Sequence, residues 1–261
     1  MTVSTISDNL SHLKPTAPSS SSHGSQEEDD HNGRPLAYVM GETEFCGLSF
    51  KVSEACLIPR PCSKILVDAA ESILLEEQQQ QHSNESLEQK RVLDIGTGSG
   101  NLLLALMHRM QNVFQAPVKG VGIDISGEAL EVARDNQTRL NIANAAFFEC
   151  DMSLLDSNQV GMFDVIMCAP PYLDEVTLDD KDKDMLAHEP AVAVYAGDGG
   201  LQWYPVLKQV VPKVLNPHGK LVLKVNRGMM DKVKDIMTGW KTVNVIKDDE
   251  GYDRCLVLEQ I

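Results

Sequence analysis

The sequence lacks three features that would place it in other classes of protein. Its six cysteines have no short paired spacing of the kind that indicates a zinc site or a disulfide framework. No apolar run approaches the roughly 18 residues of a membrane-spanning helix. The first 33 residues contain no arginine and several acids, unlike a mitochondrial presequence. We therefore expect reduced thiols, no metal site, no membrane partner and a cytoplasmic location, with the mitochondrion and the nucleus left open.

Basic residues are also scarce. Lysine and arginine number 23 against 38 aspartates and glutamates, which gives a formal net charge of -15. Nucleic-acid binding gains much of its affinity from cations that neutralise phosphates, so this balance disfavours a nucleic-acid partner. The composition favours a protein or a small molecule as substrate.

Residues 1–35 contain few apolar side chains. They are rich in serine and acids, with a serine run at 19–22 and an acidic run at 27–30. This small apolar surface does not offset the conformational entropy that the chain would lose on ordering. The segment is therefore predicted to be a disordered tail. A β-hairpin and an entry segment are expected over 36–60, and the main domain over 61–261.

Glycine is concentrated where the chain is most informative. Residues 91–95 form an apolar run, Gly96-Thr97-Gly98-Ser99-Gly100 follows, and 101–107 are again rich in apolar side chains. This order predicts a strand, a tight loop and a helix, an arrangement in which main-chain N–H groups approach a ligand closely. A glycine turn can also serve close packing alone, so other segments must decide between the two interpretations.

Apolar periodicity predicts alternating strands and helices through the rest of the domain. The expected strands are a hairpin about Gly47, buried strands at 118–124, 145–150 and 162–168, a strand at 220–225, and a closing antiparallel pair at 243–246 and 255–258. The expected helices begin near Ile65 and Ser126 and span 201–215 and 229–237, with a polar loop at 76–90 and a lid-like loop at 173–188. This pattern is typical of an α/β fold with a doubly wound, mostly parallel sheet.

An acid stands at the end of the second of these parallel strands. From this position Asp124 can accept hydrogen bonds from ribose hydroxyls, as in NAD enzymes and in S-adenosylmethionine enzymes. The alternative is that Asp124 caps the helix that begins near Ser126. The exit of the strand at 162–168, that is, the residues that directly follow it, distinguishes between NAD and S-adenosylmethionine as cofactor.

That exit carries Ala169-Pro170-Pro171-Tyr172, which resembles the Asn-Pro-Pro-Tyr signature of methyltransferases that act on planar nitrogen. Other segments resemble the release-factor glutamine methyltransferase family. They are the hairpin at 38–52, Leu-Ile-Pro-Arg-Pro at 57–61, His-Glu-Pro-Ala and its continuation at 188–201, and residues 247–254. The resemblance covers residues 38–261, and the combination is far more specific than any single motif.

The resemblance implies a seven-stranded, Rossmann-like class I methyltransferase fold. It also implies S-adenosylmethionine as cofactor and, as substrate, the Gly-Gly-Gln glutamine of a peptide-chain release factor, in translation termination. By similarity, Asp94, Gly96, Thr97, Gly98, Ser99 and Gly100 line the methionine part of the cofactor. Asp124 then meets the ribose, Asp151 the adenine amino group and Met152 the adenine face, while Ala169, Pro170, Pro171 and Tyr172 hold the amide. A helper subunit is left open.

Ala169 departs from the family pattern, which has asparagine at this position. An amide nitrogen is a poor nucleophile, so the site must orient it and accept its N–H bonds as positive charge develops. In the family the asparagine side chain and the carbonyl of the first proline do so. Loss of one such group is expected to slow transfer by about a hundredfold or more. Three interpretations follow. A neighbouring residue or a water molecule replaces the asparagine side chain, the acceptor is a different group, or the chain binds cofactor and partner without turnover.

The sequence departs from the family pattern in two other places. Cys62-Ser63-Lys64 stands where the family usually has acids, and the family's N-terminal helical recognition domain has no counterpart in residues 1–35.

An adenine-directed nucleic-acid methyltransferase shares Pro-Pro-Tyr, but the acidic composition disfavours it. A dehydrogenase is disfavoured because no hydride-transfer partner is evident. Trp203 and Tyr204 lie on a helical pattern that predicts core packing.

Overall fold

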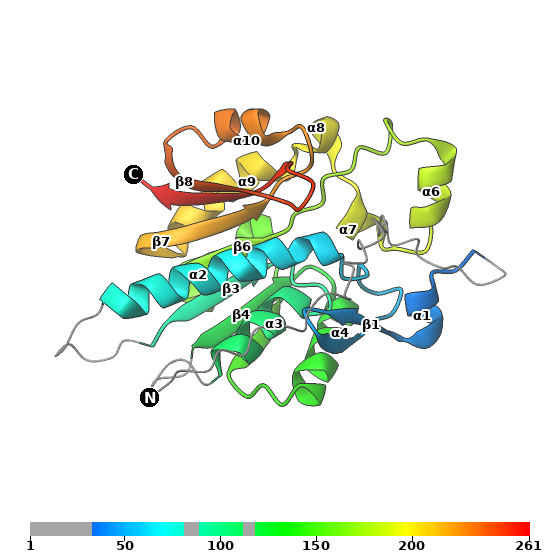
Figure 1. Cartoon of the computed structure of the whole chain (residues 1–261), viewed down its shortest axis with the longest axis horizontal. Coiled ribbons are helices and arrows are strands. Elements are labelled where there is room, and N and C mark those ends of the chain that lie inside the picture. The colour runs from blue at the N-terminus through cyan, green and yellow to red at the C-terminus, as the bar shows by residue number, and fades with distance from the viewer. Residues whose placement is uncertain (1–32, 81–88, 112–117) are drawn as a thin grey trace, which may run out of the picture.

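A computed structural model describes residues 33–80, 89–111 and 118–261, and its centre is one twisted sheet (Figure 1). The strand order is β5-β4-β3-β6-β7-β9-β8, and β9 runs antiparallel to both of its neighbours while the other neighbouring pairs are parallel. The strands are β3 Arg91–Ile95, β4 Lys119–Asp124, β5 Ala145–Glu149, β6 Phe163–Cys168, β7 Leu215–Lys224, β8 Trp240–Lys247 and β9 Asp253–Gln260. The predicted doubly wound sheet with an antiparallel C-terminal pair is confirmed.

Helices cover both faces of the sheet and create two cores. One core packs α2 (Lys64–Gln80), α3 (Asn101–Met110) and α4 (Gly127–Arg139) against one face, and the other packs α9 (Trp203–Val210) and α10 (Met230–Ile236) against the opposite face. Successive side chains of β3 alternate between them, with Val92 in the first core and Leu93 in the second. Because both faces are covered, the central strands are apolar almost throughout.

Shorter helices complete the connections. They are α1 Leu36–Met40, α5 Ser157–Val160, α6 Asp180–Leu186, α7 Ala191–Val194 and α8 Gly197–Gly200, with 3-10 turns η1 Pro61–Ser63, η2 Met152–Leu154 and η3 Val211–Lys213. Ser126 caps α4, since its side chain accepts a hydrogen bond from the N–H of Ala129 at 3.1 Å. None of the helices in the described ranges is long and apolar enough to cross a membrane.

A two-stranded hairpin, β1 Glu42–Phe45 and β2 Leu48–Lys51, packs beside the main sheet. Asn136 of α4 holds it in place. The amide oxygen of Asn136 accepts the N–H of Lys51 at 2.6 Å, and its Nδ2 donates to the carbonyls of Lys51 and Ser99, each at 2.9 Å. This buried side chain therefore connects the hairpin with the glycine loop.

Several boundaries differ from the sequence-based expectations. Residues 76–80 continue α2 instead of forming loop, and residues 180–186 form helix α6 inside the predicted lid-like loop. The strand β5 is not buried as predicted, because it is the edge strand and Phe148 is 48% exposed. The predicted helix 201–215 ends in η3, and Leu215 begins β7. Most of the predicted tail and the middle of the predicted polar loop lie outside the described residues.

Candidate active site

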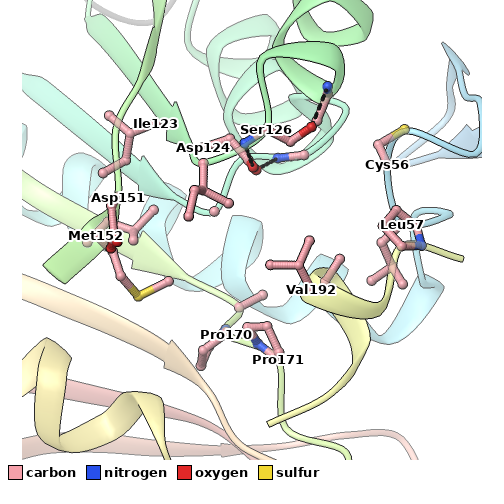
Figure 2. Close-up of a pocket in the computed structure, with 18 of the residues that line it drawn as sticks. Cys56, Leu57, Ile123, Asp124, Ser126, Asp151, Met152, Pro170, Pro171 and Val192 are labelled. Atoms are coloured by element: carbon pink, nitrogen blue, oxygen red, sulfur yellow. Dashed lines mark hydrogen bonds between the residues drawn. The ribbon is translucent and has the colours of Figure 1, made fainter.

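A pocket opens where β3, β4, β5 and β6 end, and its empty space, including the part open to solvent, is about 840 Å³. These four strands are parallel, so the residues that follow them meet at one edge of the sheet. Figure 2 shows Asp124, Asp151, Met152, Pro170 and Pro171 around this space. Cys56, Leu57 and Val192 approach it from the entry segment and from α7.

The glycines of the loop after β3 have two different roles. Gly98 has a φ of 54°, and a Cβ built on Gly96 or Gly98 would meet nothing within 4 Å, so the main chain here borders open space. A Cβ on Gly100 would lie 3.0 Å from Leu104 and 3.2 Å from Ala133. Gly96 and Gly98 therefore line the cavity, whereas Gly100 allows close packing of α3 and α4.

Asp124 borders the cavity and shapes the adjoining loops. One carboxylate oxygen accepts the N–H of Gly98 at 2.8 Å and the other accepts the N–H of Ser126 at 3.0 Å. Burial raises the pKa of Asp124, and these N–H groups oppose that shift. Each carboxylate oxygen has a second lone pair, so the group can accept further bonds from a ligand.

Asp94 lies beneath the glycine loop and is fully buried. Its Oδ2 accepts the hydroxyl of Thr97 at 2.8 Å, while Oδ1 makes no hydrogen bond of good geometry in the described part of the chain. Burial raises the pKa of Asp94 to about 7; the Thr97 hydroxyl and, more weakly, the N–H of Leu103 oppose this shift, and the charge of Asp124 adds to it. A cation bound nearby would stabilise this carboxylate.

The predicted cofactor residues thus fall into two groups. Gly96, Gly98, Asp124, Asp151 and Met152 line the cavity. The remaining four pack around it without lining it: Asp94, Thr97, Ser99 and Gly100.

A second cavity, of about 450 Å³, adjoins the first. Both are lined by Leu57, Ala193 and residues 169–171, and we call this last segment the partition between them. Tyr172 lines only the second cavity. The four residues of the Ala-Pro-Pro-Tyr motif are therefore brought together, but at position 169 the partition carries only a methyl group.

Some residues of the site are not predicted from the sequence. Trp203 lines the first cavity, with its Nε1 buried and without a hydrogen-bond partner in the described chain, so the prediction of core packing fails for Trp203 and holds for Tyr204. Glu189 accepts the N–H of Ile58 at 3.0 Å and pairs with Arg60. This contact joins two motifs that sequence resemblance had identified separately.

The chemistry of the first cavity fits S-adenosylmethionine. Its lining is mainly apolar, with the carboxylates of Asp124 and Asp151 at its edge and open main chain at Gly96 and Gly98. The unpartnered oxygen of Asp94 lies directly before this loop. No cluster of histidine, cysteine or acidic side chains in the described ranges could hold a metal ion.

Comparison with known proteins identifies the family. A family model described as "Methyltransferase domain" matches residues 86–255. The release factor glutamine methyltransferase of Bacteroides thetaiotaomicron is 33% identical, over 85% of this chain and 74% of that protein. The protein of that name from Bradyrhizobium diazoefficiens is 35% identical, over 79% and 65%. The chain therefore spans about two thirds to three quarters of the length of these relatives.

Solved structures agree on the fold. A methyltransferase from Pyrococcus furiosus is 23% identical, with a TM-score of 0.51 over 82% of this chain and 90% of that one. Fold and cavity define a class I methyltransferase whose cofactor is S-adenosylmethionine. Within this class, the chain belongs to the release factor glutamine methyltransferase family.

Proposed function

We propose that the protein transfers a methyl group from S-adenosylmethionine to the side-chain amide of a glutamine in a peptide-chain release factor. The observation that carries this proposal is that Ala169, Pro170 and Pro171 line both the cavity that contains Asp124 and Met152 and the smaller cavity that contains Tyr172. The names of the relatives support the glutamine and the release factor.

In this proposal the residues of the first cavity hold the cofactor. The main chain at Gly96 and Gly98 borders its amino-acid end, with Asp94 opposing the ammonium group. Asp124 accepts the ribose hydroxyls, while Asp151 and Met152 border the adenine. When bound, the cofactor supplies a methyl group activated by a positively charged sulfur.

The second cavity holds the acceptor amide, and its residues determine the rate. The main-chain carbonyl of Pro170 accepts an N–H of the amide, and the ring of Tyr172 packs on its plane. Ala169 offers no polar atom, so the positive charge that develops on the nitrogen has one stabilising acceptor fewer. We expect transfer to be slower than with asparagine by about a hundredfold.

The lack of a polar side chain at position 169 also favours a second candidate, a protein that binds cofactor and release factor without turnover. The two candidates differ in one measurable quantity, the methyl transferred per enzyme molecule. Incubation with labelled S-adenosylmethionine and a release factor should label the Gly-Gly-Gln glutamine, slowly, under the first candidate. A release factor with alanine in place of that glutamine is the matched control. Normal cofactor binding with no label after long incubation would establish the second candidate instead.

A further inference from the structure

Lys224, the last residue of β7, is a charged side chain in the interior. It is 2% exposed, and its Nζ donates to Ser63 Oγ at 2.6 Å and to Cys62 Sγ at 3.3 Å. In the part of the chain that the structure describes, no carboxylate forms an ion pair with this ammonium. A buried cation needs a counter-charge, and of its two partners only the thiol of Cys62 can readily lose a proton.

Arg254 of β9 is a second buried cation beside the same sulfur. It is 6% exposed, and its Nη2 donates to Cys62 Sγ at 3.9 Å. Asp248 lies 3.9 Å from its Nε and shares the guanidinium with the sulfur. Burial raises the pKa of the Cys62 thiol, but the charges and hydrogen bonds of Lys224 and Arg254 outweigh this effect, so the pKa is lowered. The cluster therefore holds the sulfur as a thiolate.

The sulfur and the ammonium belong to different cavities. Cys62 is exposed and lines a groove between α2 and the strands β8 and β9, whereas Lys224 lines the second cavity beside Tyr172. Lys64 also lines the groove, but it pairs with Asp68 at 2.6 Å. The contact between Cys62 and Lys224 therefore connects an exposed groove with the second cavity.

We propose that Cys62 is a modification site, at which the thiolate held by Lys224 and Arg254 undergoes exchange with small disulfides that enter the groove. The thiolate attacks one sulfur of the disulfide, whose S–S bond breaks as the new one forms, and the other half leaves as a thiolate. Cys62 is oxidised in this step and the leaving half is reduced. Exposed thiolates in positively charged surroundings are the ones that react selectively, whereas buried thiols are inert.

Modification of Cys62 has a consequence for methyl transfer, and this part of the inference rests on the proposed function. The mixed disulfide is neutral at the sulfur, so Lys224 loses its counter-charge. Its Nζ lies 5.7 Å from the centre of the Tyr172 ring, at the cavity of the acceptor amide. Positive charge develops on the acceptor nitrogen during transfer, and an uncompensated ammonium nearby opposes it. Modification should therefore slow transfer severalfold.

Alkylation by iodoacetamide tests the reactivity of Cys62 without any turnover. The full chain is treated briefly near pH 7, and mass spectrometry of its peptides measures the label on each cysteine. Cys46 and Cys150 are internal controls, since both are partly exposed and burial raises the pKa of both thiols. We expect Cys62 to react faster than either by about tenfold or more, and oxidised glutathione to form its mixed disulfide there first. Equal alkylation rates, or no mixed disulfide at Cys62, would overturn the proposal.

Variants then assign this reactivity to Lys224. Lys224→Met should slow alkylation of Cys62 about tenfold near pH 7, while Lys220→Met, in the same strand but bound to Glu259 at 3.5 Å, should leave it unchanged. Normal cofactor binding shows that each variant is folded. A wild-type rate in folded Lys224→Met protein contradicts the role of this ammonium. Should Lys224→Met not fold, the pH profile of the wild type decides, because a midpoint at the ordinary thiol pKa of about 8.5 would overturn the proposal.

Methyl transfer tests the consequence of modification. Oxidised glutathione should slow transfer by the wild type, and dithiothreitol should restore it. Cys62→Ser should be slow before treatment and unaffected by it, whereas Cys62→Asp, which keeps a negative charge, should transfer like the unmodified wild type. Equal transfer by modified and unmodified wild type would exclude the effect on the acceptor cavity. Absence of label on a release factor with the unmodified wild type would count against the proposed function alone, since the reactivity of Cys62 is measured separately.

Discussion

Asp124 accepts a hydrogen bond from the main-chain N–H of Gly98 at 2.8 Å. The contact joins the carboxyl ends of two neighbouring strands, and the second oxygen of the same carboxylate holds the N–H of Ser126. One side chain therefore fixes the loops after β3 and β4 and also faces the cofactor cavity. Its removal should affect both loop order and ligand contacts.

Asp124→Ala should weaken cofactor binding. Loss of hydrogen bonds to a charged group costs about 1.5–3 kcal/mol, which corresponds to roughly ten- to hundredfold in the dissociation constant. Calorimetric titration with S-adenosylhomocysteine measures the change. Asp231→Ala, on the exposed side of α10, is the control and should bind normally. An unchanged constant for Asp124→Ala would show that this carboxylate is not a ligand contact.

Cofactor affinity should depend on pH through Asp94. In the free protein its pKa is raised to about 7, so the carboxyl takes up a proton below neutral pH, while a bound ammonium favours the ionised form. Affinity should therefore fall by up to about tenfold per pH unit below 7. Asp94→Asn should give weaker and pH-independent binding. A flat profile for the wild type between pH 8 and 5.5 would contradict this role.

The same shift has a definite sign for stability. The folded state favours the protonated carboxyl, so this contribution to stability is fully present below the unfolded pKa of about 4 and is lost as pH rises through 7. Unfolding by denaturant should thus show that Asp94→Asn gains stability relative to the wild type between pH 5 and pH 8. If the difference in the free energy of unfolding between Asp94→Asn and the wild type were the same at pH 5 and pH 8, it would be inconsistent with the raised pKa.

Ala169→Asn should raise the rate of methyl transfer to a release factor by about a hundredfold, because it restores an acceptor for the amide N–H. The dissociation constant of the cofactor should change little. Ala193→Asn is a matched control, since Ala193 also lines both cavities but lies outside the strand exit. Wild-type transfer as fast as that of Ala169→Asn would mean that another group already replaces the asparagine.

Gly200→Ala should disturb the acceptor cavity. A Cβ at this position would lie 2.2 Å from the carbonyl oxygen of Tyr172, so the chain must shift as well as adopt a strained φ. We expect a loss of about 2–4 kcal/mol in the free energy of unfolding and weaker peptide binding. Gly199→Ala shares the positive φ but meets nothing within 4 Å, so it should cost only about 1 kcal/mol. Similar losses for both would exclude the contact with Tyr172 as the cause.

Asn136→Ala should detach the hairpin from the glycine loop. It removes hydrogen bonds to Lys51 and Ser99 and leaves main-chain groups unpaired, at a cost of about 2–4 kcal/mol. Chemical denaturation measures this loss, and faster amide hydrogen exchange in β2 should accompany it. Asn158→Ala, at an exposed position, should leave both unchanged. Normal protection of β2 in Asn136→Ala would contradict the connecting role.

The central strands and the glycine loop could be predicted from the sequence because strands covered on both faces leave an apolar signal. That signal places β5 correctly but overstates its burial, since β5 is an edge strand in which Phe147 is buried and Phe148 is exposed. Asp124 can be predicted from the sequence because its position after a strand places it at the ligand-binding end of the sheet.

Other site residues could not be found in this way. Helical periodicity groups Trp203 and Tyr204 with the core, but it does not tell which residue at a helix start meets a cavity. Lys224 ends an apolar strand like many surface lysines, and its burial depends on Ser63, which is 161 positions away. Such long-range contacts leave no local pattern.

The order β7-β9-β8 has a consequence for synthesis and folding. Strand β8 precedes β9 in the chain but pairs only with it, so β8 has no partner in the sheet until β9 has emerged from the ribosome. Until then β7 presents an unpaired edge, which is a site for association with other chains. The acceptor cavity includes Lys224 of β7, so its lining is complete only after strands β3 to β6, which carry much of the cofactor cavity, have been made.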